Sequence, residues 1–386
     1  MASRTSKRGS SKKAGSKKST SKKSAAKGTA RAATTRRDDK LAALAPLAAV
    51  SSSQVDRFIQ AKESWSDQLL RPRAAATFAA RRAAAASPTP EHNVVGVGIS
   101  EKLVGGRHTG VMAIKFLVRV KYNDQQIPSS ERLPEEINGL PTDVEEVGTF
   151  RRFEAVQPLA VTPDPRTLLR PAPPGCSVGF QDPGGNFVMA GTFGALARRG
   201  SRLFVLSNNH VLANENRLPV GSSTFQPGFL DAGSPPVTDE IARLSAFVDL
   251  QPFDFNFVDA AISEVLDPSL VTNAIIKIGA PTGVAAAQDK MPVHKFGRTT
   301  GYRVGLIETT MMDVSIEYEI GVLNFKNQII IKGLNGQQFS TNGDSGSAII
   351  ERNTGRAVGL LFAGSSSHTI ANHMNDVLQA LNIRLA

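Results

Sequence analysis

Short apolar runs alternate with Gly, Asn and Pro turns through the second half of the chain, from Ser177 to its end. Strands that pack one face on a core show such runs of about four to eight residues, bounded by turn residues. We therefore expect a mainly β fold, built as a sandwich or a pair of barrels. The expected strands are residues 186–194, 202–207, 257–265, 302–310, 314–320, 328–332, 347–351 and 356–362.

Helical periodicity is expected on either side of this region. Residues 51–86 repeat apolar side chains at helical spacing, with Ser52 or Ser53 as the cap and Pro72 as an interruption. Residues 372–381 carry the same spacing at the end of the chain. They predict a closing helix.

A third pattern lies between the first helix and the β-rich region. Residues 93–100 and 110–121 predict two strands, 133–138 a short helix, and 142–150 a further strand. The chain is thus expected to divide into a tail at 1–50, a helical segment and linker at 51–91, a small α+β domain at 92–155, a proline-rich connector at 156–174, and a final domain at 175–386.

The positive charge of the chain is confined to its start. Residues 1–40 carry 14 Lys and Arg against 2 Asp, a net charge of +12, whereas the remainder has a net charge of −1. The segment repeats Ser-Lys-Lys and holds no aromatic residue, so residues 1–50 are expected to be a disordered basic tail. Its charge fits binding to nucleic acid or another polyanion by counterion release. A solvated tail without a partner is the alternative.

The start of the chain does not follow the pattern of an export signal. Residues 41–50 are apolar and follow two arginines, but the basic leader is long and two aspartates intervene. The sequence has no uninterrupted run of about 18 apolar residues, the length that a helix needs to span a membrane. Cys176 is the single cysteine, which excludes an internal disulfide. We expect a cytoplasmic protein, nucleoid-associated if the tail binds nucleic acid, with export as the alternative.

Two motifs carry candidate chemistry. Gly343-Asp344-Ser345-Gly346-Ser347 sets a serine on a glycine-flanked turn, where the N–H groups of Gly343 and Ser345 can converge as an oxyanion hole. His210 follows the apolar run that ends at Leu206, and it can act as the base that removes the serine proton.

A carboxylate must hold the histidine in the correct tautomer, and three aspartates qualify. They are Asp249, Asp254 and Asp259. Asp259 is favoured because the apolar run around it would shield and direct its charge. Asp254, between two phenylalanines, is the second candidate.

In the order His210, Asp259, Ser345 the chain resembles trypsin/chymotrypsin-like serine peptidases over residues of about 175–382. The segments Gly297-Arg-Thr-Thr-Gly-Tyr-Arg-Val-Gly305 and Thr369-Ile-Ala-Asn372 are similar to parts of the bacterial α-lytic protease and streptogrisin group. The resemblance implies a double six-stranded β-barrel, with the site between the barrels.

The resemblance also implies roles for residues beside the serine. It places His210 and Asp259 on the first barrel and Ser345 on the second. It implies an ion pair between Arg298 and Asp344 that forms the oxyanion hole without proteolytic activation, since a buried carboxylate needs a partner.

Specificity residues are expected on either side of the serine. Residues 337–342 include no acidic side chain that would select Lys or Arg. Phe339, Phe362 and Gly364 are expected to line a restricted apolar pocket for uncharged side chains. His368 could instead favour glutamate.

We therefore expect a serine endopeptidase that acts on protein or peptide substrates through an acyl-enzyme. No cofactor and no metal is expected, because the sequence has no cysteine pair, no His-x-x-x-His and no nucleotide-binding glycine motif. The alternative is a nucleic-acid-bound interaction module with a degenerate or self-processing protease-like domain. The oligomeric state is not predicted.

Overall fold

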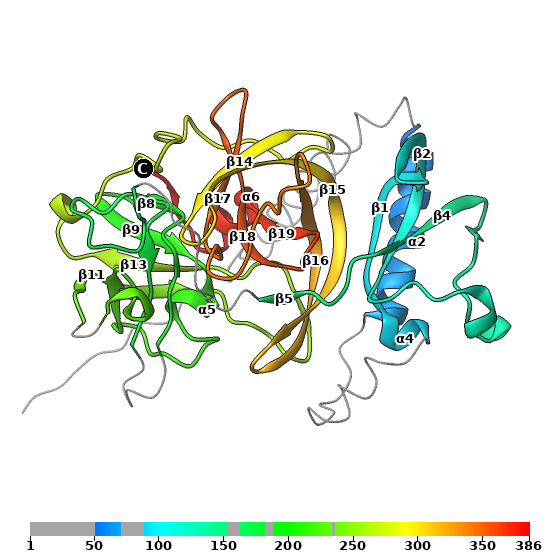
Figure 1. Cartoon of the computed structure of the whole chain (residues 1–386), viewed down its shortest axis with the longest axis horizontal. Coiled ribbons are helices and arrows are strands. Elements are labelled where there is room, and N and C mark those ends of the chain that lie inside the picture. The colour runs from blue at the N-terminus through cyan, green and yellow to red at the C-terminus, as the bar shows by residue number, and fades with distance from the viewer. Residues whose placement is uncertain (1–50, 71–88, 153–162, 182–187, 234–235) are drawn as a thin grey trace, which may run out of the picture. The chain divides into compact units, whose positions relative to one another are not determined.

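The computed structural model describes residues 51–70, 89–152, 163–181, 188–233 and 236–386 (Figure 1). The predicted tail at 1–50 lies outside the described residues, as do most of the predicted linker and part of the proline-rich connector. Strands dominate the described part of the chain, so the predicted mainly β class is confirmed.

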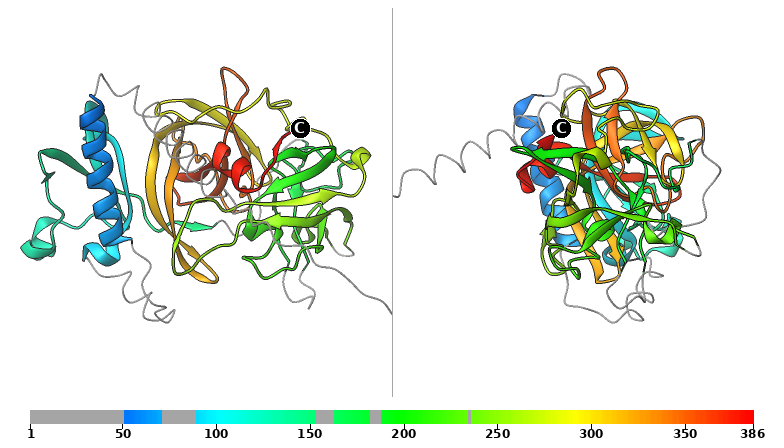
Figure 2. Two further views of the ribbon diagram at one scale, coloured as in Figure 1. Left: turned by 180° about the vertical axis from the view of Figure 1, so that it is seen from behind. Right: turned by 90° about the vertical axis from the view of Figure 1, so that its left-hand side faces the viewer.

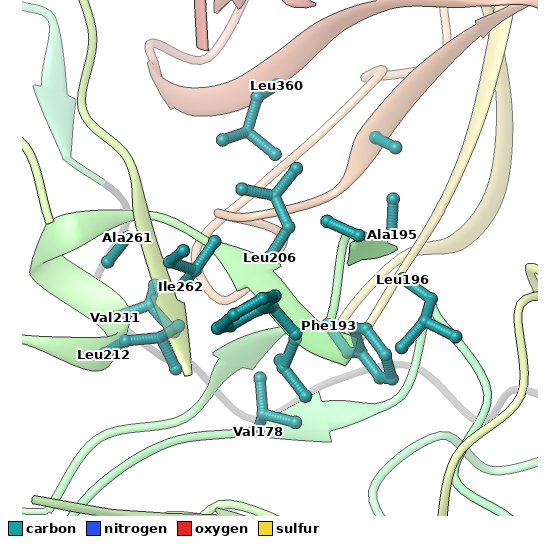
Figure 3. Packing of buried hydrophobic residues seen from close by; sticks show 14 of the residues in the cluster. Val178, Phe193, Ala195, Leu196, Leu206, Val211, Leu212, Ala261, Ile262 and Leu360 are labelled. Carbon is teal, nitrogen blue, oxygen red and sulfur yellow. The ribbon is translucent and has the colours of Figure 1, made fainter. Parts of the chain in front are cut away.

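Six described strands of the second half form one antiparallel sheet in the order β10-β11-β13-β9-β8-β20. Their bounds are β8 Ala195–Arg199, β9 Arg202–Ser207, β10 Ser223–Gln226, β11 Asp239–Phe247, β13 Ala261–Val265 and β20 Arg384–Leu385. Because β20 comes from the end of the chain, the C-terminus returns to this sheet. Figure 3 shows the buried side chains on its inner face, among them Leu206 of β9 and Ile262 of β13.

Six more strands of the second half close into a barrel. Their order is β16-β19-β18-β17-β14-β15, and β15 also pairs with β16, which completes the ring. The bounds are β14 Pro292–Gly297, β15 Gly301–Tyr318, β16 Gly321–Gly333, β17 Ala348–Glu351, β18 Ala357–Gly364 and β19 Thr369–His373. The predicted pair of six-stranded β units is confirmed.

One long strand replaces two that the sequence predicts. Residues 302–310 and 314–320 were expected as separate strands, but β15 runs through both. Its register against β16 shifts between Ile307 and Thr309, and again on either side of Met312. Such bulges bend a strand without ending it.

The expected two strands near the start are confirmed as the antiparallel pair β1 (Val94–Val104) and β2 (Arg107–Val118). β4 (Leu140–Glu146) lies parallel to β2. The helix α2 (Ser52–Leu69) packs on the pair (Figure 1, Figure 2). The Trp65 and Phe116 ring centroids are 5.4 Å apart. The short helix predicted at 133–138 is wrong. The strand β3 (Glu136–Ile137) pairs with β4 instead, and Asn138 and Gly139, both with positive φ, form the turn between them.

This α+β unit is joined to the barrel by backbone hydrogen bonds. Residues Gly96 to Gly98 of β1 pair with Met312 to Val314 of β15, so one sheet runs through both. A Cβ at Gly98 would lie 2.6 Å from the end of the Met312 side chain and 3.0 Å from the Met311 carbonyl oxygen, so a larger residue would have to displace Met312.

The remaining elements are short. They are α4 Pro90–Asn93, η2 Asp124–Gln126, η3 Ser129–Glu131, β5 Arg151–Arg152, β6 Ser177–Val178, β7 Gly191–Thr192, α5 Asn209–Leu212, η4 Phe229–Asp231, β12 Phe255–Asn256, η5 Pro268–Leu270 and α6 Met374–Ala380. The closing helix predicted at 372–381 is confirmed as α6. Of the helices described, none combines the length and apolarity that crossing a membrane requires.

Candidate active site

Two paired strands bring His210 and Asp259 together. His210 lies in α5, which follows β9, and Asp259 lies two residues before β13. In the pairing of β9 with β13, Ser207 stands opposite Ala261. His210 Nδ1 is consequently 2.5 Å from Asp259 Oδ2, and both side chains are fully buried.

Five further hydrogen bonds fix the position of Asp259, and one of them runs from the His210 backbone N–H to its Oδ1 at 3.3 Å. The Asn209 N–H donates to its Oδ1 at 2.7 Å, and the Tyr318 hydroxyl donates to its Oδ2 at 2.7 Å. Its backbone N–H donates to Asn372 Oδ1, and its carbonyl accepts from Asn208 Nδ2. A carboxylate with this many partners is held in one orientation toward the imidazole.

Tyr318 is a residue of this site that the sequence reasoning missed. Burial, together with the neighbouring charge of Asp259, raises the pKa of its hydroxyl well above the usual value, so it remains a donor. Tyr318 is the last residue of β15, far from Asp259 in sequence, and only the pairing of strands brings the two together.

The other candidate aspartates lie on the surface. Asp249 and Asp254 are both exposed. Asp254 Oδ1 accepts the N–H of the next residue, Phe255, at 2.7 Å. Neither is placed to contact the imidazole.

Ser345 lies on the turn that precedes β17, with a side chain that is almost fully buried. Its Oγ donates to the carbonyl oxygen of Phe362 at 3.2 Å, and its own carbonyl accepts the Thr192 N–H at 2.8 Å. His210 Nε2 is buried and has no hydrogen-bond partner in the described part of the chain. The structure therefore joins His210 to Asp259, and no hydrogen bond between described atoms joins Ser345 to His210.

The turn around the serine leaves two N–H groups available. Gly343 has φ of +90°, which favours glycine, and its carbonyl accepts Thr192 Oγ1 at 3.0 Å. Among the described residues, no hydrogen bond from the backbone N–H of Gly343 or Ser345 is found. Both groups can thus donate to an oxygen of a bound molecule.

The ion pair predicted between Arg298 and Asp344 is wrong. Lys295 of β14 contacts Asp344 instead, with its Nζ 2.9 Å from Oδ2 and both side chains fully buried. Arg298 turns to Asp231, with its Nε 2.5 Å from Oδ2 of that residue. Each buried carboxylate thus has its own cation.

The segment Gly297-Arg298-Thr299-Thr300 holds the carboxylate of Asp344 in place. The N–H groups of Thr299 and Thr300 donate to Oδ1 at 2.9 and 3.1 Å. Burial opposes ionisation, but the Lys295 charge and these hydrogen bonds hold the pKa of the Asp344 carboxyl below its usual range. A Cβ at Gly297 would lie 2.5 Å from Oδ1, so a glycine is needed there.

Two of the residues predicted for the specificity pocket, Phe339 and Phe362, are buried and belong to different hydrophobic clusters, and their role in a pocket stays a prediction. The Phe362 ring packs against Phe325, with centroids 4.8 Å apart, whereas Phe339 lies in a separate cluster with Ile331 and Ile349. Gly364 lies in β18 and pairs with β5.

A cluster of charged groups surrounds His368. Glu145, Glu308 and His368 offer three ligand atoms within 4.8 Å of one another. Lys115 contacts Glu145 at 2.9 Å and Lys332 contacts Glu308 at 3.1 Å, so the two carboxylates already have cations. Burial lowers the pKa of His368, but the carboxylates of Glu145 and Glu308 outweigh burial and raise this pKa above its usual value. We interpret the group as an ion-pair network.

No family model and no curated protein matches the chain. Solved structures that resemble it include several proteases and a human heparin binding protein. A glutamic acid specific serine protease that uses a histidine triad in substrate binding aligns over 100% of its chain and 55% of this one, at 16% identity and a TM-score of 0.39. Thermobifida fusca Protease A aligns over 97% and 55%, at 18% identity and a TM-score of 0.39. Alpha-lytic protease homolog N4 aligns over 97% and 55%, at 15% identity and a TM-score of 0.38.

Proposed function

We propose that the protein is a serine endopeptidase that hydrolyses peptide bonds through an acyl-enzyme. Ser345 is the nucleophile, His210 the general base and Asp259 the residue that orients the imidazole. The contact that carries the proposal is the 2.5 Å distance between His210 Nδ1 and Asp259 Oδ2. It fixes the Nδ1–H tautomer, and Nε2 is then a proton acceptor.

The proposed reaction uses one proton carrier throughout. His210 Nε2 takes the proton of Ser345 Oγ as Oγ bonds to the carbonyl carbon, and the oxyanion receives the N–H groups of Gly343 and Ser345. The C–N bond then breaks, and His210 returns its proton to the leaving amine. Water then attacks the carbonyl carbon of the acyl-enzyme, and His210 Nε2 takes its proton. The bond between that carbon and Ser345 Oγ breaks, His210 returns the proton to Oγ, and the carboxylic acid is released.

The resting geometry requires a small adjustment before the first step. The Ser345 hydroxyl must exchange the Phe362 carbonyl for His210 Nε2 as its acceptor. A rotation about χ1 moves Oγ without moving the backbone, and catalytic hydrogen bonds are often loose before substrate binds.

Covalent labelling tests the proposal. We predict that a fluorophosphonate probe labels the full-length protein at one site, and that Ser345→Ala and His210→Ala abolish labelling. Each should also lower the turnover of a small ester about 10³-fold or more, because triad members act as a unit. Unlabelled but folded wild-type protein would favour the alternative, an interaction module with a degenerate protease-like domain.

The aspartate assignment has a matched control within the same segment. Asp259→Asn removes the charge that stabilises the imidazolium, and we expect a severe loss of ester turnover. Asp254→Asn alters an exposed carboxylate and should leave turnover within a factor of about two. Equal effects of the two substitutions would overturn the assignment.

A further inference from the structure

The short strand β5 occupies an edge of the barrel beside the catalytic serine. It runs antiparallel to β18, with Arg152 opposite Ala363 and Arg151 opposite Gly364. On its other side it pairs with the end of β15. An extended segment of the chain thus adds a strand to the end of β18, as peptide ligands do when they bind a sheet edge.

This edge leads directly to the nucleophile. Phe362 is the residue before Ala363 in β18, and its carbonyl oxygen accepts the Ser345 hydroxyl at 3.2 Å. If a peptide pairs with β18 as β5 does, one of its residues stands opposite Ala363, as Arg152 does. The next residue of the peptide then stands opposite Phe362. The carbonyl of that residue is the one that Ser345 can reach.

The side chain of Arg152 contacts two glutamates, Glu215 and Glu319, which we call the acidic pocket; the exposed Arg217 contacts the other oxygen of Glu319 at 2.7 Å. Arg152 Nε lies 2.6 Å from Glu215 Oε1, and its Nη2 lies 2.5 Å from Glu319 Oε1. The side chains of Arg152 and Glu215 are 4% and 2% exposed, so this pair is withdrawn from water. Glu215 also accepts the N–H groups of Glu319 and Ile320, which hold its carboxylate in place.

The pocket is built on the same loop as the catalytic histidine. Glu215 follows His210 by five residues, in a run of three residues with positive φ. The next residue, Asn216, exchanges two hydrogen bonds with Asn209, which precedes the histidine. The acidic pocket and the base are thus positioned by one anchored turn.

Glu215 requires a cation in this pocket. A carboxylate buried without a partner is strongly destabilising, and Arg152 is the cation in direct contact with it. If β5 leaves the edge of β18, a guanidinium from another peptide can restore the pair. Arginine fits better than lysine, because its planar group reaches both Glu215 and Glu319.

We propose that Glu215 and Glu319 form a specificity subsite for arginine at the second residue on the amino side of the cleaved bond. The substrate class is peptides with a basic residue at that position, and β5 fills the subsite in the resting chain. The inference rests on the proposed peptidase function. Displacement of β5 is then a condition for substrate binding.

A binding experiment isolates the subsite from catalysis. The host is the full chain with Ser345→Ala and Arg152→Ala, which empties the pocket and prevents turnover. The probes are fluorescein-labelled Ala-Arg-Arg-Phe amide and Ala-Arg-Gln-Phe amide, measured by fluorescence anisotropy. We expect the arginine peptide to bind at least about 30-fold more tightly, as for a buried charge pair that loses one partner.

Matched variants identify the residues responsible. Glu215→Gln in the host should reduce the preference for the arginine peptide to less than about threefold. Glu317→Gln changes an exposed carboxylate that contacts Arg151, and it should leave the preference unchanged. The chain that retains Arg152 should bind the arginine peptide more weakly than the host. Thermal unfolding confirms that each variant is folded, and Arg152→Gln is the second host.

Separate outcomes overturn the two proposals. Equal affinity for the two peptides, no binding of either, or a preference that survives Glu215→Gln would overturn the subsite. Failure of the fluorophosphonate to label Ser345 in the wild-type chain would overturn the peptidase function and leave a measured arginine preference intact.

Discussion

At the scale of single residues, the charge of Asp344 has the largest consequence for the site. It precedes Ser345, is fully buried, and depends on Lys295 for its ionised form. The pair fixes the turn that carries Ser345, the proposed nucleophile, and the N–H groups of Gly343 and Ser345. A buried carboxylate that loses its cation destabilises a protein by about 3–5 kcal/mol.

We predict that Lys295→Met lowers the free energy of unfolding by this amount and reduces ester turnover. In a double-mutant cycle with Asp344→Asn, the coupling energy between Lys295 and Asp344 should exceed about 1 kcal/mol, as for residues in contact. The measurement is urea unfolding of the four proteins, with turnover as the second observable.

The cycle of Arg298→Met with Asp344→Asn is the matched control. Arg298 contacts Asp231 and is linked to Asp344 only through Thr299, so its coupling to Asp344 should be smaller than that of Lys295. A larger coupling for Arg298 than for Lys295 would contradict the assignment from the structure.

The partners of Lys295 and Arg298 could not be predicted from the sequence. The motifs around His210 and Ser345 show which residue types could react, and the apolar run around Asp259 favours the aspartate that contacts the imidazole. Which cation meets Asp344 depends on strand pairing. One signal was present: Lys295 occupies the same strand phase as the buried Val293.

At the scale of elements, the bulged middle of β15 holds the α+β unit against the barrel. Asp313 lies at the bulge, and Lys62 of α2 contacts its Oδ1 at 2.5 Å, with both side chains fully buried. Ser66 of the same helix donates to Oδ2 at 2.6 Å. A helix from the start of the chain therefore neutralises a charge inside the barrel sheet.

We predict that Lys62→Met lowers the melting temperature, because Asp313 is left buried without its nearest cation. Adding Asp313→Asn should recover part of the loss, since the charge is then removed. The control is Lys326→Met: this buried lysine lies 3.5 Å from Asp313, farther than the 2.5 Å of Lys62, so the loss that arises through Asp313 should be smaller. A larger loss for Lys326→Met than for Lys62→Met would contradict this account.

Asp313 also explains why the sequence pattern predicted two strands where the structure has the single strand β15. A polar residue in an apolar run usually indicates a turn, and Asp313 was placed between two predicted strands. Here the bulges turn Asp313 toward a lysine that comes from another part of the chain. Local periodicity cannot reveal a partner about 250 residues away.

At the scale of the whole molecule, the α+β unit continues the barrel sheet through β1 and β15. The composition change and the proline-rich connector favour separate domains, but hydrogen bonding across the boundary is decided by edge strands that sequence patterns do not identify. Binding of residues 1–40 to nucleic acid stays a prediction, because those residues lie outside the described part of the chain.

Removal of the α+β unit should therefore damage the barrel. A chain that begins at Leu168 loses β1, α2 and β5, so it exposes the edge of β15 and leaves Asp313 and Glu215 without Lys62 and Arg152. Exposed strand edges promote aggregation, and each unpaired buried carboxylate is strongly destabilising. We predict insoluble or molten protein from this chain, and soluble, folded protein from one that begins at Ser51. Sedimentation and circular dichroism of the two proteins provide the measurement. A stable, monomeric short form with ester turnover above that of the longer form would instead mean that the α+β unit only covers the site.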